Sequence, residues 1–185
     1  METTRFSSEF YQQIDARPTT YNGVRYKSGL EAWWAAFFDE CGWKHEYEPP
    51  TPGPRVPDFV LRGLNKDIYV EVKPTEEIDN EVFEIAREWK CGSDIMLLGN
   101  CPDFTRNIVR LGWMSESEKI GGDVAHALPD EVFVSEAYYG GLDFFHSTGW
   151  RNNKMHGSSQ IIIASSGVVE SLWVRAGKNI HGEEI

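Results

Sequence analysis

A β-hairpin is predicted between residues 57 and 73, where apolar and polar side chains alternate around a Gly/Asn turn. In its second arm the apolar residues share one face, while Glu71 and Lys73 share the other face, about 7 Å apart by the rise of a strand. A hairpin of this length brings Asp58, in the first arm, near Glu71. Two carboxylates and a lysine are therefore expected to converge at the open side of a sheet.

Helical periodicity predicts three longer helices, and a short one is expected over residues 7–14. The helix over residues 28–41, closed by Gly42, carries aromatic residues at every turn, which indicates deep packing against a sheet. The helix over residues 75–91 has an apolar stripe and acidic residues in its first turn. The last helix is predicted from Ser165 or Ser166 through Gly177.

The other apolar runs predict strands joined by turns. Asn22-Gly23 is a hairpin signal within residues 19–25, and Gly140-Gly141 is a second one. Strands are expected over residues 43–48, 93–100, 107–114, 131–139, 142–146 and 160–164. Residues 150–156 are basic, aromatic and free of acidic side chains, which is typical of a solvated loop and also suits contact with nucleic acid.

The composition is that of a globular cytoplasmic protein. Its length of 185 residues predicts a single domain, residues 1–185, and the hydrophobic fraction of 41% is ordinary for a packed core. No apolar run is long enough for a membrane span, and residues 1–15 lack the apolar core of a signal peptide. Three cysteines without CxxC spacing predict reduced thiols and argue against a zinc site.

The net charge of −11 argues against a protein that coats nucleic acid indiscriminately. It does not exclude a nuclease, because bound metal ions reverse the sign of the charge locally. Residues 144–182 carry a net charge of +3, and within them Arg151 and Lys154 are candidate phosphate contacts and Trp150 is a candidate for base stacking. Lys90 is explained by the dipole of its predicted helix and is also a candidate contact to a phosphate backbone.

Asp58, Glu71 and Lys73 suit metal-dependent phosphodiester cleavage. Mg²⁺ prefers oxygen ligands and is usually held by one or two carboxylates, with water and phosphate oxygens completing its octahedron. The ion polarises the phosphate and lowers the pKa of a bound water. A lysine beside it can orient the attacking water or offset developing negative charge.

The pattern Pro57-Asp58 … Glu71-Val72-Lys73 resembles that of the PD-(D/E)xK nuclease superfamily. The string over residues 25–35 is similar to the opening of small stand-alone nuclease-like proteins from phages and bacteria. The resemblance covers about residues 21–100 and implies a restriction-endonuclease-like α/β core, a mixed central sheet flanked by helices. Residues 101–185 would add a β-rich C-terminal part. The second predicted helix lacks the Gln and Tyr that RecB-like relatives carry one turn apart.

The resemblance also implies a function and a set of site residues. Asp58, Glu71 and the Val72 carbonyl would bind Mg²⁺, for which Mn²⁺ can substitute, while Lys73 positions the water and Glu31 supports a metal. The expected substrate is DNA, and the expected location is the cytoplasm of a bacterium or a phage-infected host cell.

Alternatives remain open at this stage. Glu31 also completes a capping box, in which its carboxylate reaches back to the Ser28 N–H. The same fold could serve as a binding protein with weak or no catalysis that recognises nucleic-acid ends or a protein partner. Seven tryptophans also suit a carboxylate-pair glycosidase, although Lys73 has no role in one.

Overall fold

The computed structural model describes residues 17–51, 55–63, 67–75, 94–105, 109–115, 134–139, 143–146, 149–154 and 166–182. For the described residues among 114–154 it gives only the course of the backbone. The helices predicted over residues 7–14 and 75–91 lie outside the described residues, apart from Thr75, and so do Lys90 and the strand predicted over residues 160–164.

Helix α2 (Gly29–Glu40) forms where the aromatic periodicity predicts it. Ser28 caps its start, since the Ser28 hydroxyl accepts a hydrogen bond from the Glu31 N–H at 3.2 Å. Gly42, with a φ of +70°, turns the chain away at its end. Every residue from Gly29 to Phe38 is buried, so the helix is enclosed all round rather than along one stripe. The prediction that its aromatic residues belong to the core is confirmed.

The described strands form one mixed sheet and one small hairpin. The hairpin pairs β1 (Thr19–Tyr21) with β2 (Val24–Tyr26) around the predicted Asn22-Gly23 turn. The sheet contains β3 (His45–Tyr47), β4 (Phe59–Leu61), β5 (Ile68–Val72), β6 (Asp94–Asp103), β7 (Arg110–Ser115), β8 (Val134–Tyr139), β9 (Asp143–His146) and β10 (Gly149–Lys154). Its spatial order is β10-β9-β8-β7-β6-β5-β4-β3, and every neighbouring pair is antiparallel except the parallel pair β5 and β6.

The predicted hairpin between residues 57 and 73 is confirmed as β4 and β5. Its register pairs Phe59 with Val70 and Leu61 with Ile68. The alternation in β5 also holds, because its apolar residues are buried and its polar residues are half-buried. The buried face of the hairpin packs into the same core cluster as the aromatic side chains of α2.

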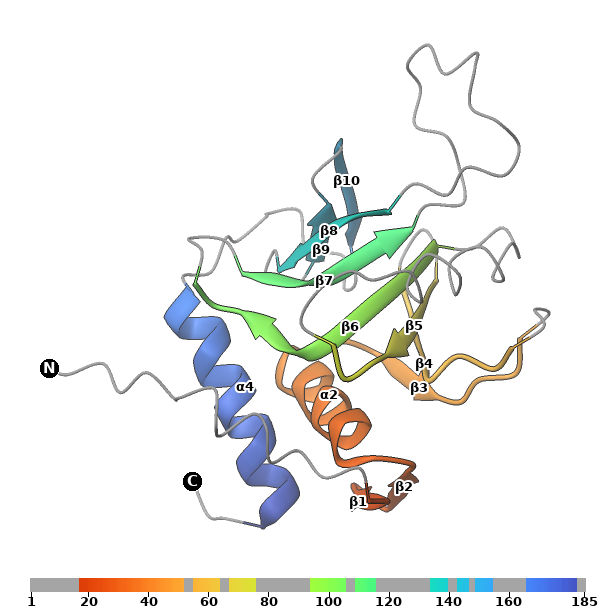
Figure 1. The fold of residues 1–185 in the computed structure, drawn as a ribbon, viewed down its shortest axis with the longest axis vertical. Coiled ribbons are helices and arrows are strands. Elements are labelled where there is room, and N and C mark those ends of the chain that lie inside the picture. Colours follow the sequence, from red (N-terminus) through yellow and green to blue (C-terminus); the bar gives the residue numbers. More distant parts are fainter. Residues whose placement is uncertain are drawn as a thin grey trace, which may run out of the picture.

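Helix α4 (Ser166–His181) lies beside α2, and the two helices cover one face of the sheet (Figure 1). The Trp33 indole N–H donates to the Trp173 carbonyl at 3.0 Å, and the two rings stack with centroids 5.6 Å apart. The predicted end of this helix at Gly177 was wrong. Gly177 lies inside the helix, which continues to His181. A Cβ at this position would stand 2.2 Å from the Trp33 ring, so a residue without a side chain lets α2 and α4 approach.

The mixed α/β class and the mixed sheet are thus confirmed, and strands β7 to β10 continue the sheet rather than forming a second one. Within the described part of the chain, neither helix combines the length and the apolar character that a bilayer crossing requires.

Candidate functional site

The β4–β5 hairpin brings the two predicted carboxylates together. Its register pairs Phe59 with Val70, so one further step places Asp58 across from Glu71. Asp58 is fixed there by its own side chain, whose Oδ2 accepts a hydrogen bond from the Val72 N–H at 2.8 Å. The predicted approach of Asp58 to Glu71 is therefore present in the structure.

Lys73 follows β5 directly and is held from two sides. Its backbone N–H donates to the Leu98 carbonyl of β6 at 2.9 Å, which continues the parallel pairing past the end of β5. Its Nζ lies 3.1 Å from Glu71 Oε1, and both side chains are mostly buried, with 30% and 12% exposed. This partial burial makes the ion pair stronger than an ordinary surface pair.

Glu31 lies in the first turn of α2 and is buried, with 9% of its surface exposed. Its Oε1 accepts from the Ser28 hydroxyl at 2.9 Å. Its Oε2 accepts from the Lys27 N–H at 3.2 Å and from the Tyr47 hydroxyl at 2.5 Å. The predicted reach of Glu31 to the Ser28 N–H was wrong, because the carboxylate instead bonds the Ser28 side chain and the N–H of the residue before it.

Electrostatics join these groups into one cluster. Burial raises the pKa of Asp58 to about 7, and the negative charges of Glu71 and, to a smaller extent, Glu31 act in the same direction. The Val72 N–H and the Lys73 charge oppose this rise without cancelling it. Asp58, at the start of β4, therefore lies near enough to Glu71 of β5 and Glu31 of α2 to be repelled by both.

Tyr47 of β3 is a site residue that sequence reasoning missed. Its hydroxyl accepts from the Lys27 N–H at 3.0 Å and donates to Glu31. Its ring packs against Tyr26 and Phe59, with centroids 4.6 and 5.3 Å away. Burial first, and then the bond to Glu31, hold the pKa of Tyr47 well above its usual range. The available signal was the alternation of residues 43–48, which turns Tyr47 inward.

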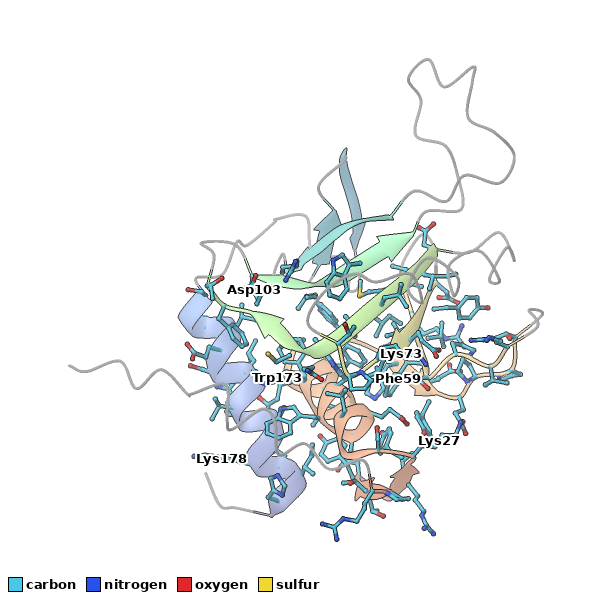
Figure 2. The ribbon with its side chains drawn as sticks, in the orientation of Figure 1. Lys27, Phe59, Lys73, Asp103, Trp173 and Lys178 are labelled. Atoms are coloured by element: carbon cyan, nitrogen blue, oxygen red, sulfur yellow. The ribbon has the colours of Figure 1, made fainter. Side chains whose placement is uncertain are left out.

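Lys27 and Glu48 were also missed as a pair. Their side chains form an ion pair. The Glu48 N–H donates to the Asp58 carbonyl at 2.8 Å, so the residue that follows β3 is tied directly to the start of β4. Glu48 has a φ of +44°, a left-handed conformation that is uncommon for a residue with a long side chain. Figure 2 shows Lys27, Phe59 and Lys73 on the side of α2 that faces away from α4.

The carboxylates fit a hard divalent cation. Asp58 uses one oxygen on the Val72 N–H and Glu71 uses one on Lys73, which leaves a second oxygen on each. Among the residues with described side chains, no group of three or more His, Cys, Asp or Glu could hold a metal ion. A cation here would therefore have two carboxylate ligands and take the rest from water, backbone or substrate, which is the usual arrangement for Mg²⁺.

The predicted nucleic-acid contacts lie elsewhere. Trp150, Arg151 and Lys154 are on β10, the outer strand of the described sheet, so the interpretation of this segment as a loop was wrong. Five strand spacings separate β10 from β5 in the sheet order, or roughly 24 Å at the usual spacing. The structure does not bring these residues together with Asp58 and Glu71.

A hollow at the other end of the β3–β4 pair does not belong to this cluster. It is lined by Asp39, Gly42, Trp43, Lys44, His45, Glu46 and Arg62. Arg62 is already bonded to Glu46 and Asp67 from this position. The charged residues that line the hollow therefore belong to a surface ion-pair network around Arg62.

Comparisons with known proteins bear on none of these residues. A scan against protein-family models, a search of curated proteins and a search of solved structures each returned no match.

Proposed function

We propose that this protein is a Mg²⁺-dependent nuclease that hydrolyses phosphodiester bonds in DNA. The observation that carries the proposal is the convergence of Asp58, Glu71 and Lys73 at one end of the β4–β5 hairpin. Burial and neighbouring carboxylates raise the pKa of Asp58 to about 7, which means that the site holds more negative charge than its surroundings stabilise. A divalent cation would relieve that excess.

Each residue of the cluster has a role in this proposal. Asp58 and Glu71, with the Val72 carbonyl, would hold the ion, which when bound supplies Lewis-acid polarisation of the phosphate and an acidic water. Lys73 holds Glu71 in place and presents a positive charge to the attacking water and the phosphate oxygens. Glu31, fixed by Tyr47 and the Lys27 N–H, adds a third carboxylate whose charge reaches Asp58.

A glycosidase is the second candidate, since a specific observation favours it. A carboxyl group whose pKa is raised to about 7 beside a second carboxyl group is the arrangement of a general acid and its partner. The ion pair between Lys73 and Glu71 argues for the nuclease, because a lysine neutralising the second carboxylate has no use in glycoside hydrolysis. Metal dependence separates the two.

The test uses purified protein on single-stranded, duplex and branched DNA, with Mg²⁺ or Mn²⁺ against a chelator. We expect cleavage only with metal. Asp58→Asn and Glu71→Gln should lose both cleavage and calorimetric metal binding, whereas Lys73→Gln should lose cleavage and retain the metal. Asp67→Asn, an exposed carboxylate of the same hairpin paired with Arg62, is the matched control and should behave as the parent.

Three outcomes would reject the nuclease proposal. They are cleavage that persists in chelator, metal affinity that is unchanged in both carboxylate variants, and DNA binding without cleavage of any substrate. The last outcome would favour the non-catalytic binding protein.

A further inference from the structure

Lys27, the residue before the Ser28 cap of α2, has an exposed side chain but a backbone bonded to the acidic cluster, which consists of Glu31, Asp58 and Glu71. The Lys27 backbone N–H is bonded to Glu31 at 3.2 Å and to the Tyr47 hydroxyl at 3.0 Å. Its backbone is therefore fixed beside the buried carboxylate of the site. Its side chain, in contrast, is 68% exposed and carries its ammonium at the end of a flexible four-carbon stem.

The charge of Lys27 is directed at the same carboxylates. Its ammonium pairs with Glu48, and the hydrogen bond to Glu48 raises the pKa of Lys27 most. The charges of Asp58 and Glu31 raise it further, so both carboxylates lie within electrostatic reach of the ammonium. Lys27 is thus a second cation near the cluster, from the residue before α2, whereas Lys73 reaches it from the end of β5.

Glu48 holds this cation from an unusual backbone position. Its left-handed conformation costs of order 1 kcal/mol for a residue other than Gly or Asn. The conformation is maintained by the bond from the Glu48 N–H to the Asp58 carbonyl at 2.8 Å. The chain therefore keeps a glutamate, and its pairing with Lys27, one backbone hydrogen bond away from a proposed metal ligand.

The charge balance of the site indicates how the ion pair between Lys27 and Glu48 could respond to a bound phosphodiester. Fully ionised, Glu31, Glu48, Asp58 and Glu71 outnumber Lys27 and Lys73 by two negative charges, and one divalent cation balances that difference. A phosphodiester then brings one further negative charge. Lys73 is already engaged by Glu71 in a mostly buried pair, whereas the exposed pair between Lys27 and Glu48 is weak enough to exchange at little cost.

We propose that Lys27 is a phosphate-binding residue of this site and that Glu48 holds its ammonium until a nucleic-acid phosphate replaces it. The inference rests on the proposed nuclease function and adds a substrate contact to it. Lys27 binds a non-bridging oxygen of the DNA backbone, and Glu48 competes with DNA for Lys27. The two halves of one ion pair therefore act on DNA binding in opposite directions.

The experiment measures binding of fluorescently labelled DNA at several salt concentrations, with Ca²⁺ replacing Mg²⁺ to suppress cleavage. Loss of one phosphate contact in Lys27→Gln should weaken binding and lower the magnitude of the salt slope by about 0.9 on duplex DNA. Glu48→Gln should keep the parental slope and tighten binding by up to about fivefold, because no carboxylate competes for Lys27. Melting temperatures of both variants report whether the fold is intact.

Arg62→Gln is the matched control, because it removes the cation of another exposed ion pair, that with Glu46, at the far end of the same strands. It should leave the salt slope unchanged. A Lys27→Gln variant with the parental slope, or weaker binding in both Lys27→Gln and Glu48→Gln, would overturn the Lys27 proposal while leaving the nuclease intact. A parent protein that neither binds nor cleaves DNA with metal would overturn both.

Discussion

At the scale of single residues, Asp58 is held at a cost to stability. Its folded pKa of about 7 lies above the ordinary value of 3.8, so the folded chain binds a proton more tightly than the unfolded chain. That contribution is fully present below about pH 4 and is lost as the pH rises through 7. The metal-free protein should therefore be strained at this position under neutral and alkaline conditions.

Replacing Asp58 by Asn should remove the strain, because the amide oxygen can still accept from the Val72 N–H without carrying charge. Relative to its effect at pH 4, the substitution should stabilise the metal-free protein at pH 8 by up to about 4 kcal/mol. Urea unfolding of parent and variant at both pH values, without metal, measures this. A stability difference independent of pH would contradict it, and Asp67→Asn should show no such gain.

Glu31 both bonds groups at the start of α2 and places a negative charge near Asp58, and substitutions can separate these two roles. Glu31→Gln keeps an oxygen for the Lys27 N–H but removes the charge that reaches Asp58, so cleavage should fall by about 10- to 100-fold, as for a residue that supports a metal ligand. Ser28→Ala instead removes the cap and one hydrogen bond to the Glu31 carboxylate but keeps its charge, so it should cost about 1 kcal/mol in unfolding free energy and retain cleavage. Rates are compared at saturating DNA. Parental cleavage by Glu31→Gln would leave Glu31 with only a structural role, as the partner of Lys27, Ser28 and Tyr47.

At the scale of elements, contact between helices α2 and α4 decides where a glycine is needed. Gly177→Ala should destabilise the protein by about 1–3 kcal/mol despite the better helix propensity of alanine, because the new methyl group meets the Trp33 ring. Gly167, in the first turn of α4, has open space around it, so Gly167→Ala should be neutral or stabilising. Thermal unfolding of both variants tests the pair. Equal effects would mean that α4 does not pack on Trp33 as described.

The end of β5 is likewise set by its neighbour strand. The Lys73 N–H bonds the Leu98 carbonyl, and the Asn100 N–H bonds the Thr75 carbonyl at 3.1 Å. At Gly99 a Cβ would stand 2.3 Å from that same carbonyl, so the absence of a side chain lets the chain pass close to β6. The position of Lys73 therefore depends on β6 as much as on its own strand.

At the scale of the whole molecule, the proposed cleavage site and the candidate phosphate contacts on β10 lie far apart. The acidic cluster lies at the β3–β5 end of the sheet, whereas Arg151 and Lys154 lie on β10 at the other end. The separation of roughly 24 Å in the sheet corresponds to about seven base pairs at 3.4 Å each. DNA bound at one end of the sheet would therefore reach the other end only if it were longer than about seven base pairs.

Arg151→Gln and Lys154→Gln should thus weaken binding of long DNA while leaving the cleavage rate at saturating substrate unchanged. Each lost phosphate contact should lower the magnitude of the salt slope by about 0.9. Titrations with a 6-base-pair duplex and a 20-base-pair duplex provide the contrast. If β10 takes no part in binding, both variants will match the parent on the longer duplex.

Much of the local structure follows from the sequence. The aromatic residues of α2 and the alternation of β5 predict their elements, because a helix and a strand place side chains with fixed periods of 3.6 and 2. The pairing of Asp58 with Glu71 follows from the same rule, since a hairpin places residues equidistant from its turn opposite one another. The boundaries were less accurate. Gly177 did not end its helix, and residues 149–154 formed the outer strand of the described sheet instead of a loop.

The sequence by itself therefore determined α2, the β4–β5 hairpin and the two carboxylates with their lysine, since all of these depend on neighbours within a few turns or across one hairpin. The surroundings of Glu31 were decided only by tertiary structure. Tyr47 and Glu48 join the site because β3 pairs with β4, 12 to 16 residues away along the chain, and also lies against the start of α2, 16 residues or more away. Such contacts depend on which strands pair and on how the buried side chains pack together. Neither can be read from the local periodicity of the sequence.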